Sequence, residues 1–163
     1  SKIEILGLFC DGKLLREFKG TENKVSHDRG VLDSDVLGCS KVSTIHNHPN
    51  GTAMTSFGDI QAFIDSYDDK MVIVTNTQNI IIEKTGEFKT KAWKLLFKPE
   101  EATENMFKHY KAVKGKLFYY HGFYQKSPYK YNTKKAWDFA VKQIQIEMFE
   151  YPFFNNNIDV SWE

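Results

Sequence analysis

The dipeptide Asp11-Gly12 constrains the fold of the start of the chain more than any other local feature. It separates two short apolar runs, "IEILGLFC" and "KLLREF". Asp-Gly between two strand-like runs is typical of a tight hairpin, because both central positions of the favoured two-residue turn have a positive φ. We therefore expect strands at about 3–10 and 13–19, and a fold built on a β-sheet.

Further strand and helix patterns follow this hairpin. The segment "KVSTIHNH" is rich in β-branched residues, which predicts a strand, and Pro49-Asn50-Gly51 ends it. Apolar residues then recur with helical spacing behind an expected N-cap, Ser56, at the positions Ile60, Phe63, Ile64 and Tyr67. "MVIVTN" and "NIIIEKT" predict two more strands. This order of elements indicates an α/β fold in which helices flank a mixed β-sheet.

The composition of the chain changes where the predicted sheet ends. Helices are expected at 100–114 and 133–150, the second capped by Thr133, and an aromatic, irregular segment separates them. We therefore predict two domains. Residues 1–98 form the α/β domain, and residues 99–163 form a helical, aromatic-rich extension that serves substrate or partner recognition.

Charge and cysteine usage narrow the class of protein. The formal net charge of the 163-residue chain is only +1, which gives no overall electrostatic reason to expect binding to nucleic acid or to an anionic membrane. No apolar run approaches the about 20 residues of a membrane span, and no leader pattern is recognised. We therefore expect a cytoplasmic protein. Cys10 and Cys39 lack the spacing of a disulfide framework, so we expect two small buried apolar side chains in a reducing compartment.

Two histidines, His46 and His48, stand at the end of the predicted central strand. Side chains alternate along a strand, so both imidazoles point to the same face, where they can bind one metal ion. The turn that follows lets the first turn of the next helix return Asp59 to that face. Two imidazoles and one carboxylate leave one tetrahedral position of zinc open, which is the mark of a catalytic rather than a structural site.

A second carboxylate and a hydroxyl complete the candidate site. Glu4 interrupts an apolar strand, and a buried carboxylate needs a partner, which the water of an open zinc site would supply. A carboxylate in this place can serve as the general base. Ser56 can cap the helix, and from the helix start its hydroxyl can donate to the oxygen of a tetrahedral intermediate.

These residues together resemble a known metallopeptidase motif. The sequence "EILG" that begins at Glu4, the sequence His46-Asn47-His48-Pro49, and then Ser56 and Asp59 have the order and spacing of the JAMM motif of the MPN/JAB family. The resemblance covers about residues 2–86. The literal "HNHP" is also similar to the RadC-like branch of the same family.

The resemblance implies an MPN/JAB-like sheet with cytidine-deaminase-like layering. It makes His46, His48 and Asp59 the ligands of Zn²⁺, Glu4 the general base and Ser56 the group that stabilises the intermediate. It also implies hydrolysis of a peptide or isopeptide bond in a protein substrate, commonly next to the C-terminus of a ubiquitin-like protein. The alternative that it implies is a RadC-like metal-binding module, associated with DNA or protein and without peptidase activity.

Three other interpretations compete with these. The letters HNH also name a nuclease motif, but its residues are spread over a ββα unit, and Asn47 would point away from the two histidines on a strand. The segment 116–131 interleaves lysines with aromatic residues, as platforms for single-stranded nucleic acid do, yet the net charge of the chain makes this interpretation the less favoured one. The third interpretation is a scaffold that uses the fold for protein interaction alone.

Overall fold

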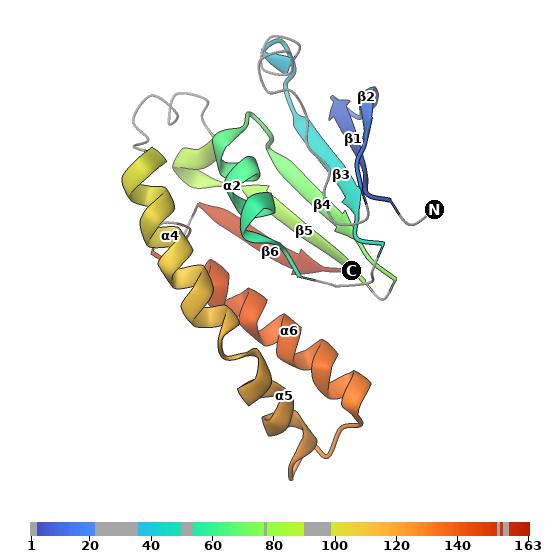
Figure 1. The fold of residues 1–163 in the computed structure, drawn as a ribbon. Coiled ribbons are helices and arrows are strands. Elements are labelled where there is room, and N and C mark those ends of the chain that lie inside the picture. Colours follow the sequence, from blue (N-terminus) through green and yellow to red (C-terminus); the bar gives the residue numbers. More distant parts are fainter. Residues whose placement is uncertain are drawn as a thin grey trace. The chain divides into compact units, whose positions relative to one another are not determined.

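The computed structural model of the protein describes residues 3–21, 36–49, 54–76, 78–89, 99–152, 154 and 157–163. It divides into two compact units, which we describe separately (Figure 1). The sheet unit contains residues 1–95 and 156–163, and the helical unit contains residues 96–155. Within the described ranges, no helix is both long and apolar enough to cross a membrane.

The sheet unit is built on one six-stranded mixed sheet with the strand order β2-β1-β3-β4-β5-β6. Its strands are β1 (Ile5–Cys10), β2 (Lys13–Lys19), β3 (Val42–Asn47), β4 (Lys70–Val74), β5 (Asn79–Lys84) and β6 (Ile158–Trp162). Strands β3 and β4 are parallel, and the other neighbouring pairs are antiparallel. The predicted α/β class with a mixed sheet is confirmed. A short 3-10 helix, η1 (Gly86–Lys89), follows β5.

The predicted hairpin is present between β1 and β2. Cys10 pairs with Lys13, so Asp11 and Gly12 form a two-residue turn with φ values of 50° and 84°. Positive φ at both positions is the geometry that an Asp-Gly turn favours, because its twist matches that of the flanking strands. This turn fixes the register of the pairs next to it, and a bulge between Leu8 and Phe9 shifts the register of the rest of the edge strand.

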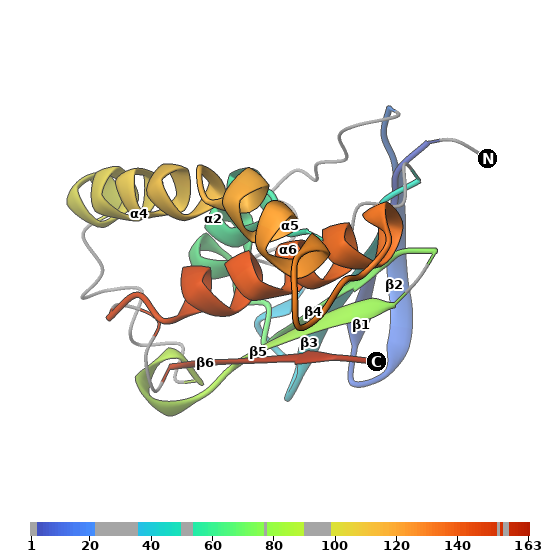
Figure 2. The same ribbon diagram turned by 90° about the horizontal axis from the view of Figure 1, so that it is seen from below.

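One face of the sheet carries the core. Its cross-strand neighbours form two buried rows, Leu6-His46-Ile73-Ile80 and Leu8-Thr44-Met71-Ile82. Helix α2 (Phe57–Asp65) lies over this face, with Ile60, Phe63 and Ile64 buried (Figures 1 and 2). Tyr67, which was expected on the helix, lies beyond its end and is partly buried against a cluster that includes Leu8 and Val42.

The predicted boundary at residue 99 is wrong for the end of the chain. Residues 158–162 form β6, which pairs along β5 from Ile80↔Trp162 to Lys84↔Ile158. The backbone N–H of Thr85 also donates to the carbonyl of Asn157 at 2.8 Å. The helical unit is therefore an insertion between β5 and β6, which are neighbours in the sheet. The change in composition indicates where this insertion begins, but it does not indicate that the chain later returns to the sheet.

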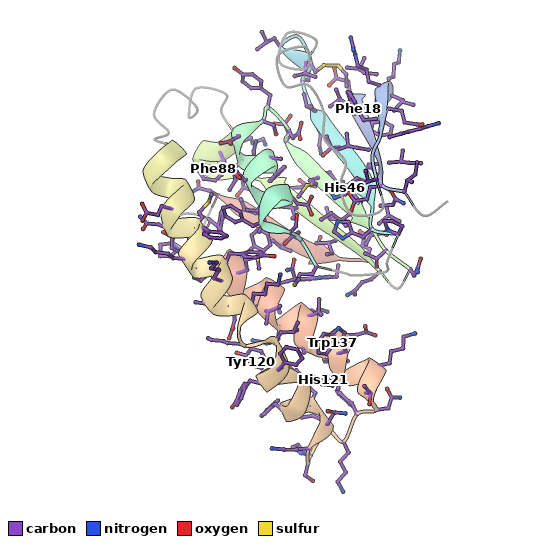
Figure 3. All side chains as sticks on the ribbon, viewed as in Figure 1. Phe18, His46, Phe88, Tyr120, His121 and Trp137 are labelled. Carbon is purple, nitrogen blue, oxygen red and sulfur yellow. A yellow bond between two sulfur atoms is a disulfide. The ribbon has the colours of Figure 1, made fainter. Side chains whose placement is uncertain are left out.

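The helical unit consists of α4 (Pro99–Lys114), α5 (Leu117–Gln125) and α6 (Thr133–Phe149). Helices α5 and α6 lie side by side, and His121 contacts Trp137 across them with ring centroids 4.8 Å apart (Figure 3). The segment predicted as irregular thus contains a helix, which was missed because its aromatic residues show no amphipathic spacing and none of its residues is buried. The cap of α6 is Asn132, whose Oδ1 accepts from the Lys135 N–H at 2.8 Å, and not Thr133.

The expectation of two free, buried cysteines is also wrong. Cys10 and Cys39 form a disulfide with a Cα–Cα distance of 5.5 Å. The register explains the pairing, because Cys10 is the partner of Val42 and the chain that leads into β3 passes the end of β1. Since disulfides are typical of oxidising environments, cysteine usage no longer supports a reducing compartment.

Candidate metal centre

Strand β3 places two imidazoles on the buried face of the sheet. His46 pairs with Leu6 on one side and Ile73 on the other, and only 3% of it is exposed. His48 follows the last residue of the strand, and its backbone N–H still donates to the carbonyl of Val74 at 2.9 Å. The strand geometry thus continues through His48, and both imidazoles lie on one face, as predicted.

A capping box at the start of α2 holds Asp59. The Ser56 hydroxyl accepts from the Asp59 N–H, and Asp59 Oδ2 accepts from the Ser56 N–H, both at 3.0 Å. This reciprocal pair satisfies two backbone donors that the helix itself cannot use. The position of Asp59 is therefore set by helix capping, and the same carboxylate faces the two imidazoles.

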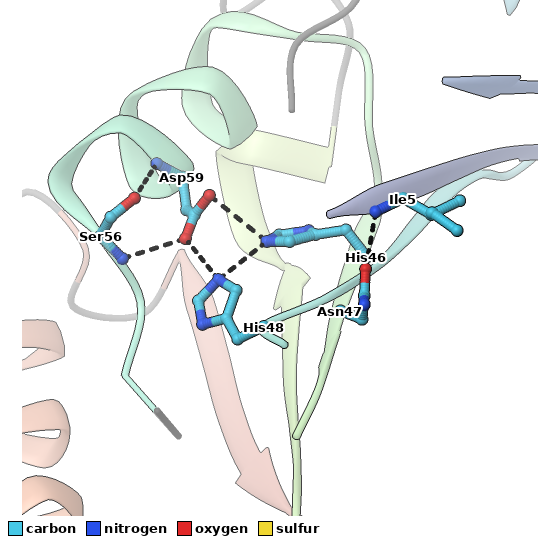
Figure 4. A network of polar contacts seen from close by, with 6 residues as sticks. All are labelled: Ile5, His46, Asn47, His48, Ser56 and Asp59. Carbon is cyan, nitrogen blue, oxygen red and sulfur yellow. Dashed lines mark hydrogen bonds and ion pairs between the residues drawn. The ribbon is translucent and has the colours of Figure 1, made fainter. Parts of the chain in front are cut away.

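The polar atoms of these three side chains lie close together, and each imidazole faces a different oxygen of Asp59 (Figure 4). Asp59 Oδ1 lies 3.3 Å from His46 Nε2, Asp59 Oδ2 lies 3.3 Å from His48 Nε2, and the two Nε2 atoms are 3.3 Å apart. Among the described residues, this is the group of acidic, histidine or cysteine side chains that could hold a metal ion, with all ligand atoms within 4.8 Å of one another.

Hydrogen bonding accounts for two of the three contacts but not for the third. If both Nε2 atoms are protonated, each N–H donates to its own Asp59 oxygen, and the two Nε2 atoms are left 3.3 Å apart with no hydrogen between them. A cation bound by both Nε2 atoms and the carboxylate accounts for all three contacts, because each group then offers it a lone pair.

The electrostatics of Asp59 suit a ligand that stays ionised. Burial by itself would raise the pKa of this carboxyl. Hydrogen bonds with His46 and His48, the charge of His46 and the Ser56 N–H outweigh burial and hold the Asp59 pKa well below its ordinary range. Asp59 is therefore ionised at neutral pH.

Glu4 lies on the same face of the sheet as the two histidines. Glu4, Leu6 and Leu8 are buried at alternate positions, and Leu6 pairs with His46. Alternate residues of a strand share a face, and so do directly opposite residues of an antiparallel pair. Glu4 is only 8% exposed, as expected for a buried carboxylate, and its oxygen is not one of the three clustered ligand atoms. Glu4 thus lies on the face of the sheet that carries the cluster without being a member of it.

Asn47 has a part in the site that was missed from the sequence. It points away from the imidazoles, as predicted, but its Oδ1 accepts from the Ile5 N–H at 2.6 Å and its Nδ2 donates to the Ile3 carbonyl at 3.2 Å. The two bonds bracket the backbone of Glu4 (Figure 4 shows the first). Only the strand register could have indicated this contact, since the residues are 42 and 44 positions apart.

The structure thus brings His46, His48 and Asp59 together, with exposed Ser56 at the start of the helix that carries Asp59. Glu4 shares their face of the sheet. Comparison with known proteins found no matching family model, no matching curated protein and no matching solved structure.

Proposed function

We propose that the protein is a zinc-dependent hydrolase of peptide or isopeptide bonds that works in the manner of the JAMM metallopeptidases of MPN/JAB fold. One observation carries the proposal. The two imidazoles and the carboxylate converge on one point beside a buried glutamate, at the end of a central strand. The order of these residues along the chain supports the same family, since it matches the JAMM pattern.

The separation of the two imidazole nitrogens fits zinc. Two zinc–ligand bonds of about 2.0–2.1 Å at the tetrahedral angle separate their ligand atoms by about 3.3–3.4 Å. The two Nε2 atoms are 3.3 Å apart, and each lies 3.3 Å from a different oxygen of Asp59. Octahedral magnesium at a similar bond length would need about 2.9 Å and prefers oxygen ligands. Imidazole nitrogens are preferred zinc ligands, so the donor set and the spacing indicate the same ion.

In this proposal, a zinc ion held by His46, His48 and Asp59 supplies Lewis acidity towards the scissile carbonyl and the attacking water. Glu4 acts as the general base, taking a proton from that water and giving it to the leaving amine.

Ser56 stabilises the oxyanion in the same proposal. Its Oγ is occupied as an acceptor by the Asp59 N–H, which leaves the hydroxyl hydrogen able to donate. The side chain is exposed at the start of α2, so a substrate oxygen can reach it. A donor at this point also benefits from the positive end of the helix dipole.

Metal analysis tests the site directly. Purified protein loaded with zinc and freed of excess should retain about one equivalent, whereas His46→Ala, His48→Ala and Asp59→Ala should each retain less than about a tenth. His121→Ala is the matched control, because this histidine lies in the helical unit and should leave zinc binding unchanged. Zinc retention by the three variants at the level of the parent protein would exclude the site.

Activity requires a second comparison. The parent protein and Glu4→Gln are assayed side by side on a ubiquitin C-terminal fluorogenic amide and on a mixed peptide library, with a chelator control. Glu4→Gln should keep its zinc and lose about 10²- to 10⁴-fold in turnover. Zinc binding without turnover of any of these substrates would favour the RadC-like alternative, and equal turnover by the two proteins would refute the role of Glu4.

A further inference from the structure

The charge of the chain is strongly segregated. From Asn105 to Trp137 the sequence contains eight lysines and no aspartate or glutamate, which amounts to +8 with histidines neutral. The whole chain carries +1, so the remaining residues together carry −7. All eight of these lysines are exposed. The helical unit as a whole has ten lysines and six acidic residues and so carries +4, and its basic residues are concentrated in this segment. The near-neutral total therefore conceals a basic segment, which reverses the electrostatic reason against a polyanionic partner.

This basic segment also exposes aromatic rings. At the tip of the α5–α6 hairpin, residues 123–139, Phe123 is 45% exposed, Tyr129 is 42% exposed and Phe139 is 39% exposed. A contiguous group of large apolar side chains that is exposed to water often marks a binding site. The rings at the tip form such a group, with further members Tyr124 and Tyr131.

The rings at the tip support one another. Phe123 and Tyr129 have centroids 5.5 Å apart, Tyr131 and Phe139 are 4.8 Å apart, and Tyr124 and Tyr131 are stacked at 6.1 Å with an angle of 14° between their planes. Ring-to-ring packing of this kind holds the exposed rings in fixed orientations, so a planar ligand that stacks on them loses less entropy.

Lysines surround these rings. Lys126, Lys130, Lys134 and Lys135 all belong to the tip and are exposed, and Asp138 is its one acidic residue. The Lys135 ammonium lies 4.2 Å from the centroid of the Tyr131 ring. Cationic groups beside exposed aromatic faces can contact phosphates while the rings stack on bases.

We propose that the tip of the α5–α6 hairpin binds single-stranded nucleic acid. The lysines contact the phosphate backbone, and the exposed rings of Phe123, Tyr129 and Phe139 stack on unpaired bases. A duplex is disfavoured, because its bases are already stacked on one another and cannot cover these rings. Binding is expected to be sequence-tolerant, since every base has a π-face.

A membrane surface fits these observations less well. A helix that lies in a membrane interface needs one apolar face and one basic face. Helix α5 has aromatic residues on all sides, and its most exposed rings, Phe118 at 77% and Tyr119 at 69%, are adjacent in sequence and so point in different directions. Helix geometry therefore favours a flexible single strand of nucleic acid, which can wrap around the hairpin, rather than a flat bilayer.

Fluorescence anisotropy of the full chain with a fluorescein-labelled oligothymidylate of about 20 nucleotides, longer than a typical single binding site, tests the proposal. We expect saturable binding at low salt. The variant K126Q/K130Q/K134Q/K135Q should bind at least about tenfold more weakly, and its plot of log K against log salt should be shallower by up to about 2.8. Tyr129→Ser should weaken binding about tenfold, which is the loss of one stacked base.

The matched control is K13Q/R16Q/K19Q/K41Q, which removes four exposed basic residues of the sheet unit and should change the affinity less than about twofold, as expected for residues outside the binding site. Four results would overturn the proposal. These are no binding at about 100 µM protein, an equal loss in the control variant, no effect of Tyr129→Ser, or binding to phosphatidylserine vesicles that the oligonucleotide does not displace. None of these measurements depends on hydrolytic activity, so the inference stands or falls separately from the proposed function.

Discussion

Replacement of Asn47 by alanine tests how the site positions Glu4. The Asn47 side chain accepts from the Ile5 N–H at 2.6 Å and donates to the Ile3 carbonyl at 3.2 Å. These bonds flank Glu4 on both sides, and they join the start of β1 to the end of β3. Without them, the strand end that carries Glu4 keeps its backbone bonds to Gly20 and Thr21 but loses its attachment to β3. Asn47 is thus a positioning residue that acts through Glu4.

The magnitude follows from the two bonds. A net protein hydrogen bond contributes about 0.5–1.5 kcal/mol, and both bonds are partly buried, so Asn47→Ala should lower the free energy of unfolding by about 2 kcal/mol. In urea unfolding, Asn79→Ala is the matched control. This asparagine is half-buried in β5, and its loss should change the unfolding free energy by less than about 0.5 kcal/mol.

Two further readouts separate positioning from stability alone. Hydrogen exchange should show the Ile5 amide losing its protection in Asn47→Ala, because its acceptor is gone. Zinc content should stay near that of the parent protein while turnover falls, since the ligands are intact and the base is displaced. The reasoning is refuted if the unfolding free energy changes by less than about 0.5 kcal/mol and the Ile5 amide exchanges as slowly as before.

Three other perturbations have defined outcomes. Ser56→Ala removes the helix cap, so it should lower the free energy of unfolding by about 1 kcal/mol. It should also lower turnover by about 10²- to 10³-fold. Ser56→Asp should restore the cap without restoring turnover, and recovery of both would show that capping is the only role of Ser56. Burial raises the pKa of Asp68 to about 6 although Lys84 opposes it, so the folded state keeps a proton that the unfolded chain has released. The free energy of unfolding should therefore fall by at most about 3 kcal/mol as the pH rises from about 4 to 6. Urea unfolding of Asp68→Asn should lack this fall. The same fall in Asp68→Asn as in the parent protein would show that Asp68 does not cause it. Reduction of the Cys10–Cys39 disulfide, which closes a segment of 29 residues, should lower the unfolding free energy by about 3–4 kcal/mol. Two free thiols in the unreduced protein would disprove the bond.

The features that were predictable from the sequence are those that depend on neighbours in the chain. The Asp11-Gly12 turn, the alternation that sets His46 and His48 on one face, and the capping box that holds Asp59 all act within a few residues. Local sterics and hydrogen bonding determine them, so a single sequence suffices. The contacts among His46, His48 and Asp59 follow from these local rules, because the strand and the helix that carry them are close in sequence.

The features that were not predictable depend on register or on packing between distant segments. The pairing of β6 with β5, the Cys10–Cys39 disulfide and the contact of Asn47 with Ile5 each require knowledge of which strands are neighbours. Helix α5 was missed for a different reason, since it buries no residue and so leaves no periodic pattern. Whole-chain charge was also a poor guide, because averaging removed the contrast between the two units.

The insertion of the helical unit between β5 and β6 has a consequence for how the protein can vary. The points at which the chain leaves and re-enters the sheet are adjacent, because Lys84 pairs with Ile158 and the Thr85 N–H donates to Asn157. Neighbouring strands are only about 5 Å apart, so a short Gly-Ser linker can join Thr85 to Asn157 in place of the chain between them. A fragment that simply stops before the insertion would instead leave the edge of β5 unpaired and prone to aggregation. The fold thus has a site where evolution or an engineer can exchange the helical unit without altering the strand and helix that carry His46, His48 and Asp59.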